Sequence, residues 1–175
     1  MNNTTQNHYK FMNHDIQIAC FDAEINDLNK VIGFTNSICE KGTVQLLQAR
    51  GLAGEKHILQ AAIQALKAFD NNENTAKDLG LEICLRASAQ RQISRALDML
   101  GIKEGKMEVC AVAVDCDKDV LNKLGEILGE MHDMMQQTDE KTLKNLYKIF
   151  HEEIKSAGNI ERVLIERTAL LNLEI

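Results

Sequence analysis

The segment KMEVCAVAVD, residues 106–115, constrains the fold most because it is apolar almost throughout. A strand with one face in water alternates apolar and polar residues, whereas a strand buried on both faces reads as a nearly continuous apolar run. The segment therefore predicts a central strand. Three other segments are also predicted strands: DIQIACFDA (15–23), TVQLLQA (43–49) and LEICLRA (81–87).

Helical periodicity fills most of the chain between and after these strands. Apolar residues recur at helical spacing in NDLNKVIGFTNSICEKG (26–42) and in GLAGEKHILQAAIQALKAFDNN (51–72). Asn26 or Asp27 is a suitable N-cap for the first helix, Thr75 for a short helix ending at Gly80, and Ser88 for a helix that runs to residue 100. Further helices are predicted over residues 117–135, 138–150 and 160–171. The pattern indicates a mixed α/β (α+β) fold with about four strands, flanking helices and a helical C-terminal third.

The length of 175 residues favours one domain, residues 15–175, after a polar lead-in over residues 1–14 that is expected to be frayed. No run approaches the roughly 18 apolar residues of a membrane span, and the N-terminus has no apolar signal region. We therefore expect a cytoplasmic protein. The cysteines are odd in number and lack a C-x-x-C pair, which predicts buried free thiols: Cys20, Cys39, Cys84, Cys110 and Cys116.

Cationic residues gather in one part of this acidic chain. The net charge is −6, yet residues 86–106 contain five cationic and two acidic side chains, a local net of +3. Arg86 is expected at the end of a strand, and Arg91 and Arg95 as an i, i+4 pair on the helix that follows Ser88. Free N–H groups at a helix N-terminus and guanidinium groups both favour phosphate or carboxylate. A solvated helix face whose arginines pair with Glu82 or Asp98 is the alternative.

Catalytic and metal-binding patterns are hard to find. The chain contains no G-x-S-x-G, no Walker loop and no G-x-G-x-x-G. His57 is a candidate base, although a histidine at a helix start is more often a surface or supporting residue. Glu126, Glu130 and His132 are close in sequence, but only the glutamates share a helix face, which is typical of a solvated surface. We therefore expect no catalytic residues, no metal and no cofactor. A small enzyme that binds a phosphometabolite, with His57 as base and the arginine-lined strand-to-helix junction as phosphate site, is the rival function.

The last predicted helix has two apolar surfaces. One stripe contains Val163, and a second spot on the far side contains Ile165 and Ala169. Such a helix can pack on its own core and on a partner. Arg167 falls within the main stripe, which requires an acidic partner or a stem that reaches solvent.

Three blocks of the sequence resemble a known family in order and spacing. They are LLQARGLAGEKHILQAAIQALKAFD, LGLEICLRASAQRQISRALDMLGIK and VLIERTALLNLEI. This pattern is similar to the kinase-binding subunit of the KEOPS complex, the Cgi or PRPK-binding protein family (also called TPRKB), in its archaeal form. Members of the archaeal form often carry an aromatic residue and a glycine where this chain has Arg86 and Ala89.

The resemblance implies a non-catalytic subunit that binds the Bud-type (PRPK) kinase of KEOPS. The complex makes the threonylcarbamoyl modification of the adenosine next to the anticodon, and archaeal members resemble recruiters of tRNA that hold its 3′ CCA end. Seven residues are then the expected RNA contacts: His57, Arg86, Ser88, Gln90, Arg91, Gln92 and Arg95. Four residues of the last helix are the expected kinase contacts: Val163, Ile165, Arg167 and Ala169.

Overall fold

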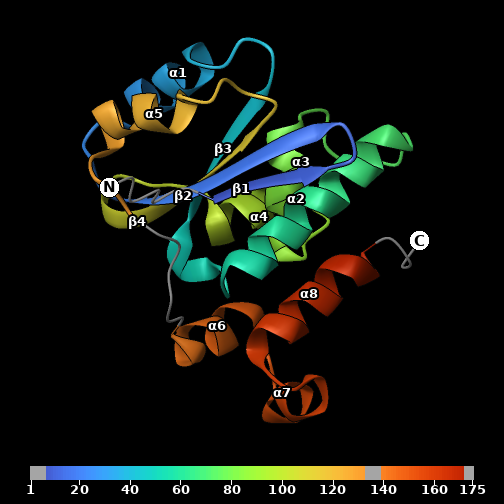
Figure 1. Ribbon diagram of the computed structural model, residues 1–175. Coiled ribbons are helices and arrows are strands. Elements are labelled where there is room, and N and C mark those ends of the chain that lie inside the picture. Colours follow the sequence, from blue (N-terminus) through green and yellow to red (C-terminus); the bar gives the residue numbers. More distant parts are fainter. Residues whose placement is uncertain (1–6, 133–138, 172–175) are drawn as a thin grey trace. The chain divides into compact units, whose positions relative to one another are not determined.

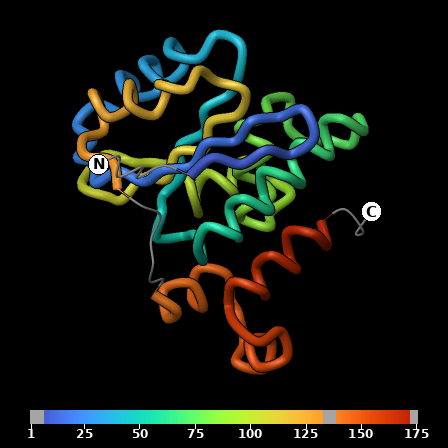
Figure 2. The backbone as a smooth tube through the Cα atoms, viewed as in Figure 1, coloured from blue at the N-terminus to red at the C-terminus, as the bar shows by residue number. Residues whose placement is uncertain are grey.

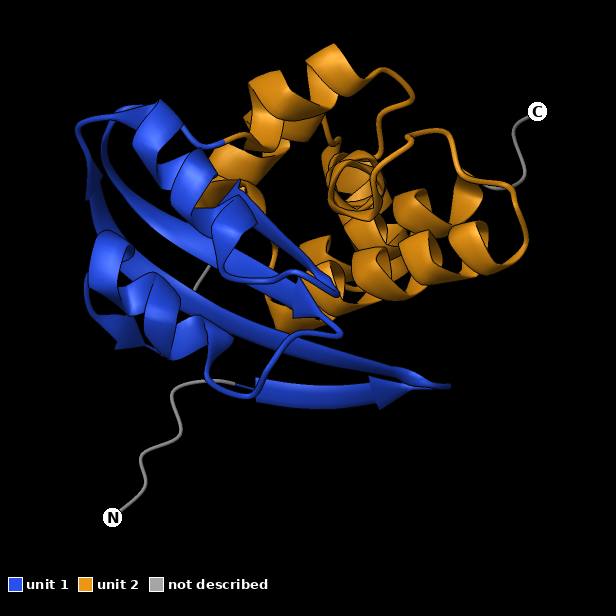
Figure 3. Cartoon of the chain, turned by 90° about the horizontal axis from the view of Figure 1, so that it is seen from above, with its two compact units in different colours: residues 1–49, 102–134 blue, residues 50–101, 135–175 orange. Residues whose placement is uncertain are grey.

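The computed structural model describes residues 7–132 and 139–171. The chain divides into two compact units, residues 1–49 with 102–134 and residues 50–101 with 135–175 (Figure 3). Each unit is therefore built from two separate stretches of sequence, which can be followed by colour along the tube in Figure 2. The mixed α/β fold with a central sheet is confirmed, and the single-domain assignment of residues 15–175 stays a prediction.

The first unit contains an antiparallel sheet with the strand order β1-β2-β4-β3, and β5 also pairs with β2 (Figure 1). Its strands are β1 (Asn7–Phe11), β2 (His14–Ile25), β3 (Thr43–Gln48), β4 (Gly105–Val114) and β5 (Met131–His132). The central position of the apolar strand is confirmed, because β4 lies between β2 and β3 and is buried from Val109 to Val114. The sequence pattern missed two strands. One of them, β1, lies in the lead-in that was expected to be frayed.

Two helices, α1 (Leu28–Ser37) and α5 (Val120–Leu128), lie side by side over one face of this sheet (Figure 1). Alternate strand residues such as Phe21 and Ala111 form a buried core with them. Asp27 caps α1 as expected, since its side chain accepts a hydrogen bond from the Lys30 N–H at 3.1 Å. The helix predicted over 117–135 is shorter, because α5 ends before Gly129 and β5 follows.

The cysteine prediction is right for three of the five residues. Cys20, Cys84 and Cys110 are buried thiols outside any disulfide, but Cys39 and Cys116 form a disulfide. The two are 77 residues apart in sequence, while their Cα atoms are 5.8 Å apart. Spacing along the chain could not indicate that pair, because pairing the strands brings the end of α1 next to the end of β4.

The second unit is helical. It contains α2 (Glu55–Asp70), α3 (Leu79–Ser88), α4 (Ile93–Leu100), α6 (Glu140–Tyr147), α7 (His151–Ala157) and α8 (Ile160–Leu170). A short 3-10 helix, η1 (Ala49–Gly51), precedes α2 in the chain. Helix α2 packs against α3 and α8, and α3 packs against α4. The last helix was predicted correctly, whereas the one expected over 138–150 ends at Tyr147 and the separate helix α7 was missed; residue 138 lies outside the described residues.

The strand predicted over residues 81–87 is wrong, because this segment belongs to α3. Its burial explains the error. Residues 82–88 are all buried, so the segment shows no exposed face that would reveal a helical period. The cap is Asp78, whose carboxylate accepts from the Leu81 N–H at 3.0 Å, so the short helix expected to begin at Thr75 and end at Gly80 is also wrong.

Among the residues that the structure describes, no helix is long and apolar enough to cross a membrane.

Candidate nucleic-acid interface

The junction between α3 and α4 is built differently from its prediction. Ser88 does not cap the second helix but ends the first, and its hydroxyl donates to the Leu85 carbonyl at 3.1 Å. Ala89 then adopts a left-handed conformation with φ 54°. Its N–H donates to the Arg86 carbonyl, and the Gln90 N–H donates to the Leu85 carbonyl. This hydrogen-bond pattern is the Schellman motif that terminates many helices, so the chain turns sharply at Ala89.

Arg86, on the near side of this turn, is an internal residue. It is only 5% exposed, and its Nε and Nη2 atoms lie 3.0 and 2.9 Å from Glu82 Oε1. The other oxygen of Glu82 accepts hydrogen bonds from the N–H groups of Thr75 and Ala76 at 3.0 and 2.7 Å. A buried carboxylate needs such a complete set of partners. Arg86 therefore compensates the charge of Glu82 and stabilises the start and end of α3, and its burial gives RNA no direct access to it.

His57 is also internal, with no exposed surface. Its Nδ1 accepts from the Ala53 N–H at 3.0 Å, and its Nε2 donates to the Ala87 carbonyl at 2.9 Å. Burial lowers the pKa of His57 to about 4, an effect that the bond to Ala87 only partly offsets. His57 is therefore neutral near pH 7 and holds the end of α3 in place. It is not available as the base expected of the phosphometabolite enzyme, and neither His57 nor the buried Ser88 can contact RNA directly.

Tyr147 adds a support that the sequence pattern did not indicate. Its buried hydroxyl donates to the Gly51 carbonyl at 2.6 Å, and the Ala87 carbonyl lies 3.2 Å away. Burial raises the pKa of Tyr147, so the phenol stays protonated and can donate. The Thr168 hydroxyl donates to the Arg86 carbonyl at 2.9 Å. The last turn of α3 is thus held by side chains from α2, α6 and α8.

Beyond Ala89 the polar side chains face solvent. A surface pocket of about 300 Å³ is lined by Ala89, Gln90, Arg91, Gln92, Arg95 and Leu171, and we call it the arginine pocket. Arg91 lies just before α4 and Arg95 in its first turn, so the predicted i, i+4 pair on one helix is wrong. The prediction that the two arginines act together is compatible with this geometry, because both line the pocket. Arg91 also lies 3.5 Å from the Leu171 carbonyl.

The chemistry of the arginine pocket is that of binding. Gln92 is the N-cap of α4, and its side chain makes no capping hydrogen bond. The first N–H groups of the helix thus add to the positive potential of Arg91 and Arg95. The lining residues supply amide and guanidinium donors, and they include no carboxylate, thiol or imidazole. Anions fit this pocket, and the side chains that line it provide no general base or nucleophile.

The four expected kinase contacts on α8 separate into two groups. Val163 is buried in the helical core, and Arg167, which is partly exposed, is bound to residues of α6 and α7. The guanidinium donates to the Tyr147 carbonyl at 2.7 Å and to both oxygens of Glu153 at 2.9 and 3.0 Å, which lowers the pKa of Glu153. Glu153 is therefore the acidic partner that the position of Arg167 required. Ala169 is exposed and Ile165 is partly exposed, so these two remain available to a partner.

The chain thus has a mixed α/β fold and an exposed pocket lined by two arginines, and comparison with known proteins identifies its family. The family model described as "Kinase binding protein CGI-121" matches residues 16–172, so the chain belongs to this family. It is 33% identical over 131 residues to the regulatory protein Cgi121 of Methanocaldococcus jannaschii, an alignment that covers 74% of this chain and 83% of the relative. It is also 29% identical over 89 residues to the KEOPS complex subunit Cgi121 of Pyrococcus abyssi, covering 51% of this chain and 52% of the relative.

Proposed function

We propose that the protein is a non-catalytic subunit of a KEOPS complex that binds the Bud-type (PRPK) kinase of the complex and recruits tRNA by its 3′ CCA end. The proposed outcome is threonylcarbamoyladenosine next to the anticodon. The family name supports kinase binding, and the name of the Pyrococcus relative supports the KEOPS complex. The observation that carries the RNA role is the exposed arginine pocket on a chain whose net charge is otherwise negative.

Each part of the pocket matches one part of a single-stranded RNA end. Guanidinium groups bind phosphate oxygens with two parallel hydrogen bonds, a role for Arg91 and Arg95. Side-chain amides pair with the edges of unstacked bases, a role for Gln90 and Gln92. RNA sequence is read mostly in such unstacked segments, and the CCA end of tRNA is one. The acidic remainder of the chain disfavours binding to RNA elsewhere, so selectivity would rest on the pocket.

The test compares one full-length tRNA with the same tRNA lacking its 3′ CCA, with each bound to the purified protein in a filter-binding or fluorescence assay. We expect truncation to weaken binding clearly, and Arg91→Ala with Arg95→Ala to remove most of that difference. Arg50→Ala is the matched control, because Arg50 is an exposed arginine outside the pocket. Equal affinity for the two RNAs would exclude the CCA end as the ligand.

The kinase contact is proposed for the exposed side of α8, at Ile165 and Ala169. An apolar side chain there is suited to an interface centre, and aspartate at Ile165 would place an unpaired charge in it. We expect Ile165→Asp to weaken binding of the purified kinase at least tenfold in calorimetry while leaving tRNA binding unchanged. Glu152→Ala, an exposed change on α7, is the control. Undiminished kinase binding by Ile165→Asp would place the interface elsewhere.

A further inference from the structure

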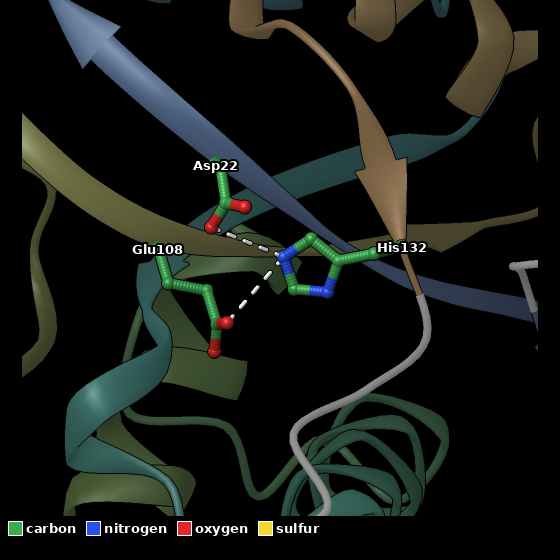
Figure 4. Close-up of side chains that lie close together, drawn as sticks. All are labelled: Asp22, Glu108 and His132. Carbon is green, nitrogen blue, oxygen red and sulfur yellow. Dashed lines mark ion pairs between the residues drawn. The ribbon is translucent and has the colours of Figure 1, made fainter.

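A cluster of three ionisable side chains lies on the sheet, separate from the residues used above. Asp22 comes from β2, Glu108 from β4 and His132 from β5 (Figure 4). Asp22 is directly opposite Glu108 in the β2–β4 pairing, and His132 is directly opposite Cys20, two residues before Asp22. Residues at i and i+2 share a face of a strand, so this register places all three side chains on one face.

The spacing of the donor atoms fits a bound metal ion. His132 Nε2 lies 3.3 Å from Asp22 Oδ1 and 3.4 Å from Glu108 Oε2. These distances exceed the roughly 2.7–2.9 Å of a charge-assisted hydrogen bond. Zinc bonds of about 2.0–2.1 Å at tetrahedral angles separate neighbouring ligand atoms by about 3.4 Å. The distances from the imidazole nitrogen to the two carboxylate oxygens therefore match the separation of neighbouring ligand atoms around a tetrahedral zinc ion.

Electrostatics favour a cation at the same place. Two carboxylates directly opposite each other on neighbouring strands repel, and the pair Asp22 and Glu108 is such a case. The side chains of Asp22, Glu108 and His132 are 79, 31 and 32% exposed, so water can complete the coordination of an ion held by them.

We propose that Asp22, Glu108 and His132 bind a divalent transition-metal ion and that zinc is the ion whose chemistry fits best. One imidazole with two carboxylates is a zinc-type ligand set, whereas magnesium and calcium prefer oxygen ligands alone. The bound ion joins three strands and fixes the two-residue strand β5 to β2. The thiols Cys20 and Cys110 have no exposed surface, so they are poor competitors for an ion that comes from solvent.

The first experiment is calorimetric titration of the metal-free full chain with zinc. We expect one ion per chain, and affinity reduced about tenfold or more by each of Asp22→Asn, Glu108→Gln and His132→Gln. His151→Gln is the matched control, since His151 is an exposed histidine in the helical unit. Asp22→Asn keeps the test valid if the other variants misfold, because its side chain is mostly exposed. Absence of zinc binding, or equal binding by all variants, would overturn the proposal.

A second measurement identifies the ligands. Cobalt(II) in place of zinc is expected to give the visible spectrum of a tetrahedral nitrogen–oxygen site, and Asp22→Asn is expected to weaken it. Strong sulfur-to-cobalt charge-transfer bands would place the ion on the cysteines instead and overturn the assignment. The cluster without metal would be only a set of contacts between His132 and two carboxylates. In that case zinc would leave the thermal unfolding temperature unchanged, whereas a metal site raises it.

Discussion

Arg86 and Arg91 are five residues apart, yet they belong to opposite environments. Arg86 lies before the left-handed turn at Ala89, is buried and pairs with Glu82. Arg91 lies after the turn, is exposed and lines the arginine pocket. Arginine thus stabilises the interior before the turn at Ala89 and lines an exposed pocket after it. Charge counted along the chain cannot separate these roles, because the turn decides which way each side chain faces.

The two environments also differ in what a lost charge costs. A buried charge that loses its partner destabilises the folded state by several kcal/mol, whereas an exposed charge contributes little. Changes before Ala89 should therefore affect folding, and changes after it should affect binding. Substitutions on the two sides of the turn test that division, beginning with the largest expected effect.

Replacing Arg86 by alanine should destabilise the protein most. Glu82 would stay buried with two backbone hydrogen bonds and without its cation, a loss of about 3–5 kcal/mol in the free energy of unfolding. Urea denaturation followed by circular dichroism measures it. Arg91→Ala is the control and should change the free energy by less than about 0.5 kcal/mol. A loss below about 1 kcal/mol for Arg86→Ala would show that the buried pair is not what stabilises the junction.

Acid should destabilise the same buried region through His57. Its folded pKa of about 4 lies below the ordinary 6.5, so the unfolded chain takes up a proton that the folded chain excludes. The stabilisation is complete above pH 6.5 and is lost as the pH falls towards 4, by about 3 kcal/mol in total. Urea denaturation between pH 7 and 4 measures how steeply the free energy of unfolding falls with pH. His57→Gln should make this fall less steep, and His151→Gln should not change it. An unchanged pH dependence in His57→Gln would assign the acid sensitivity to other groups.

Removing the exposed arginines should affect RNA binding alone. Each arginine that pairs with a phosphate should, when replaced by alanine, weaken binding by about 1 kcal/mol and reduce the slope of log affinity against log salt by about 0.7. Arg91→Ala with Arg95→Ala should therefore lower the slope by about 1.4 without changing stability. Titrations of tRNA at several salt concentrations give this value. A weaker affinity at an unchanged slope would mean that the arginines do not bind phosphates.

Replacing Ala89 by glycine should increase the free energy of unfolding. A left-handed backbone costs a residue with a Cβ about 1–2 kcal/mol, and glycine removes that cost but adds entropy to the unfolded chain. Ala89→Gly should thus stabilise the protein by about 0.5–1 kcal/mol in the same denaturation assay, with tRNA binding retained. Ala87→Gly, in the last turn of α3, is the control and should destabilise. Destabilisation by both changes would contradict the left-handed turn.

The sequence indicated the central strand, the cap of α1 and the existence of the last helix, because these depend on local periodicity and on the side chain next to the helix start. It also indicated Arg91 and Arg95 as one cationic site. It could not distinguish helix from strand in residues 81–87, because a fully buried segment has no polar face, and the spacing of polar residues is what separates a helical period from a strand period.

Sequence alone therefore determined the fold class, the acidic charge with one cationic segment and the family resemblance, since all of these are written in residue types and spacing. Tertiary structure decided the rest. It turned Arg86 inward, paired Cys39 with Cys116, gave Arg167 its partner and brought Asp22, Glu108 and His132 from three strands to one place. The disulfide, the Arg167 ion pair and the three-strand cluster join residues far apart in the chain, whereas the Arg86–Glu82 pair is local and only its burial depends on how α3 packs. Strand register and helix packing set such contacts and such burial, and local pattern does not.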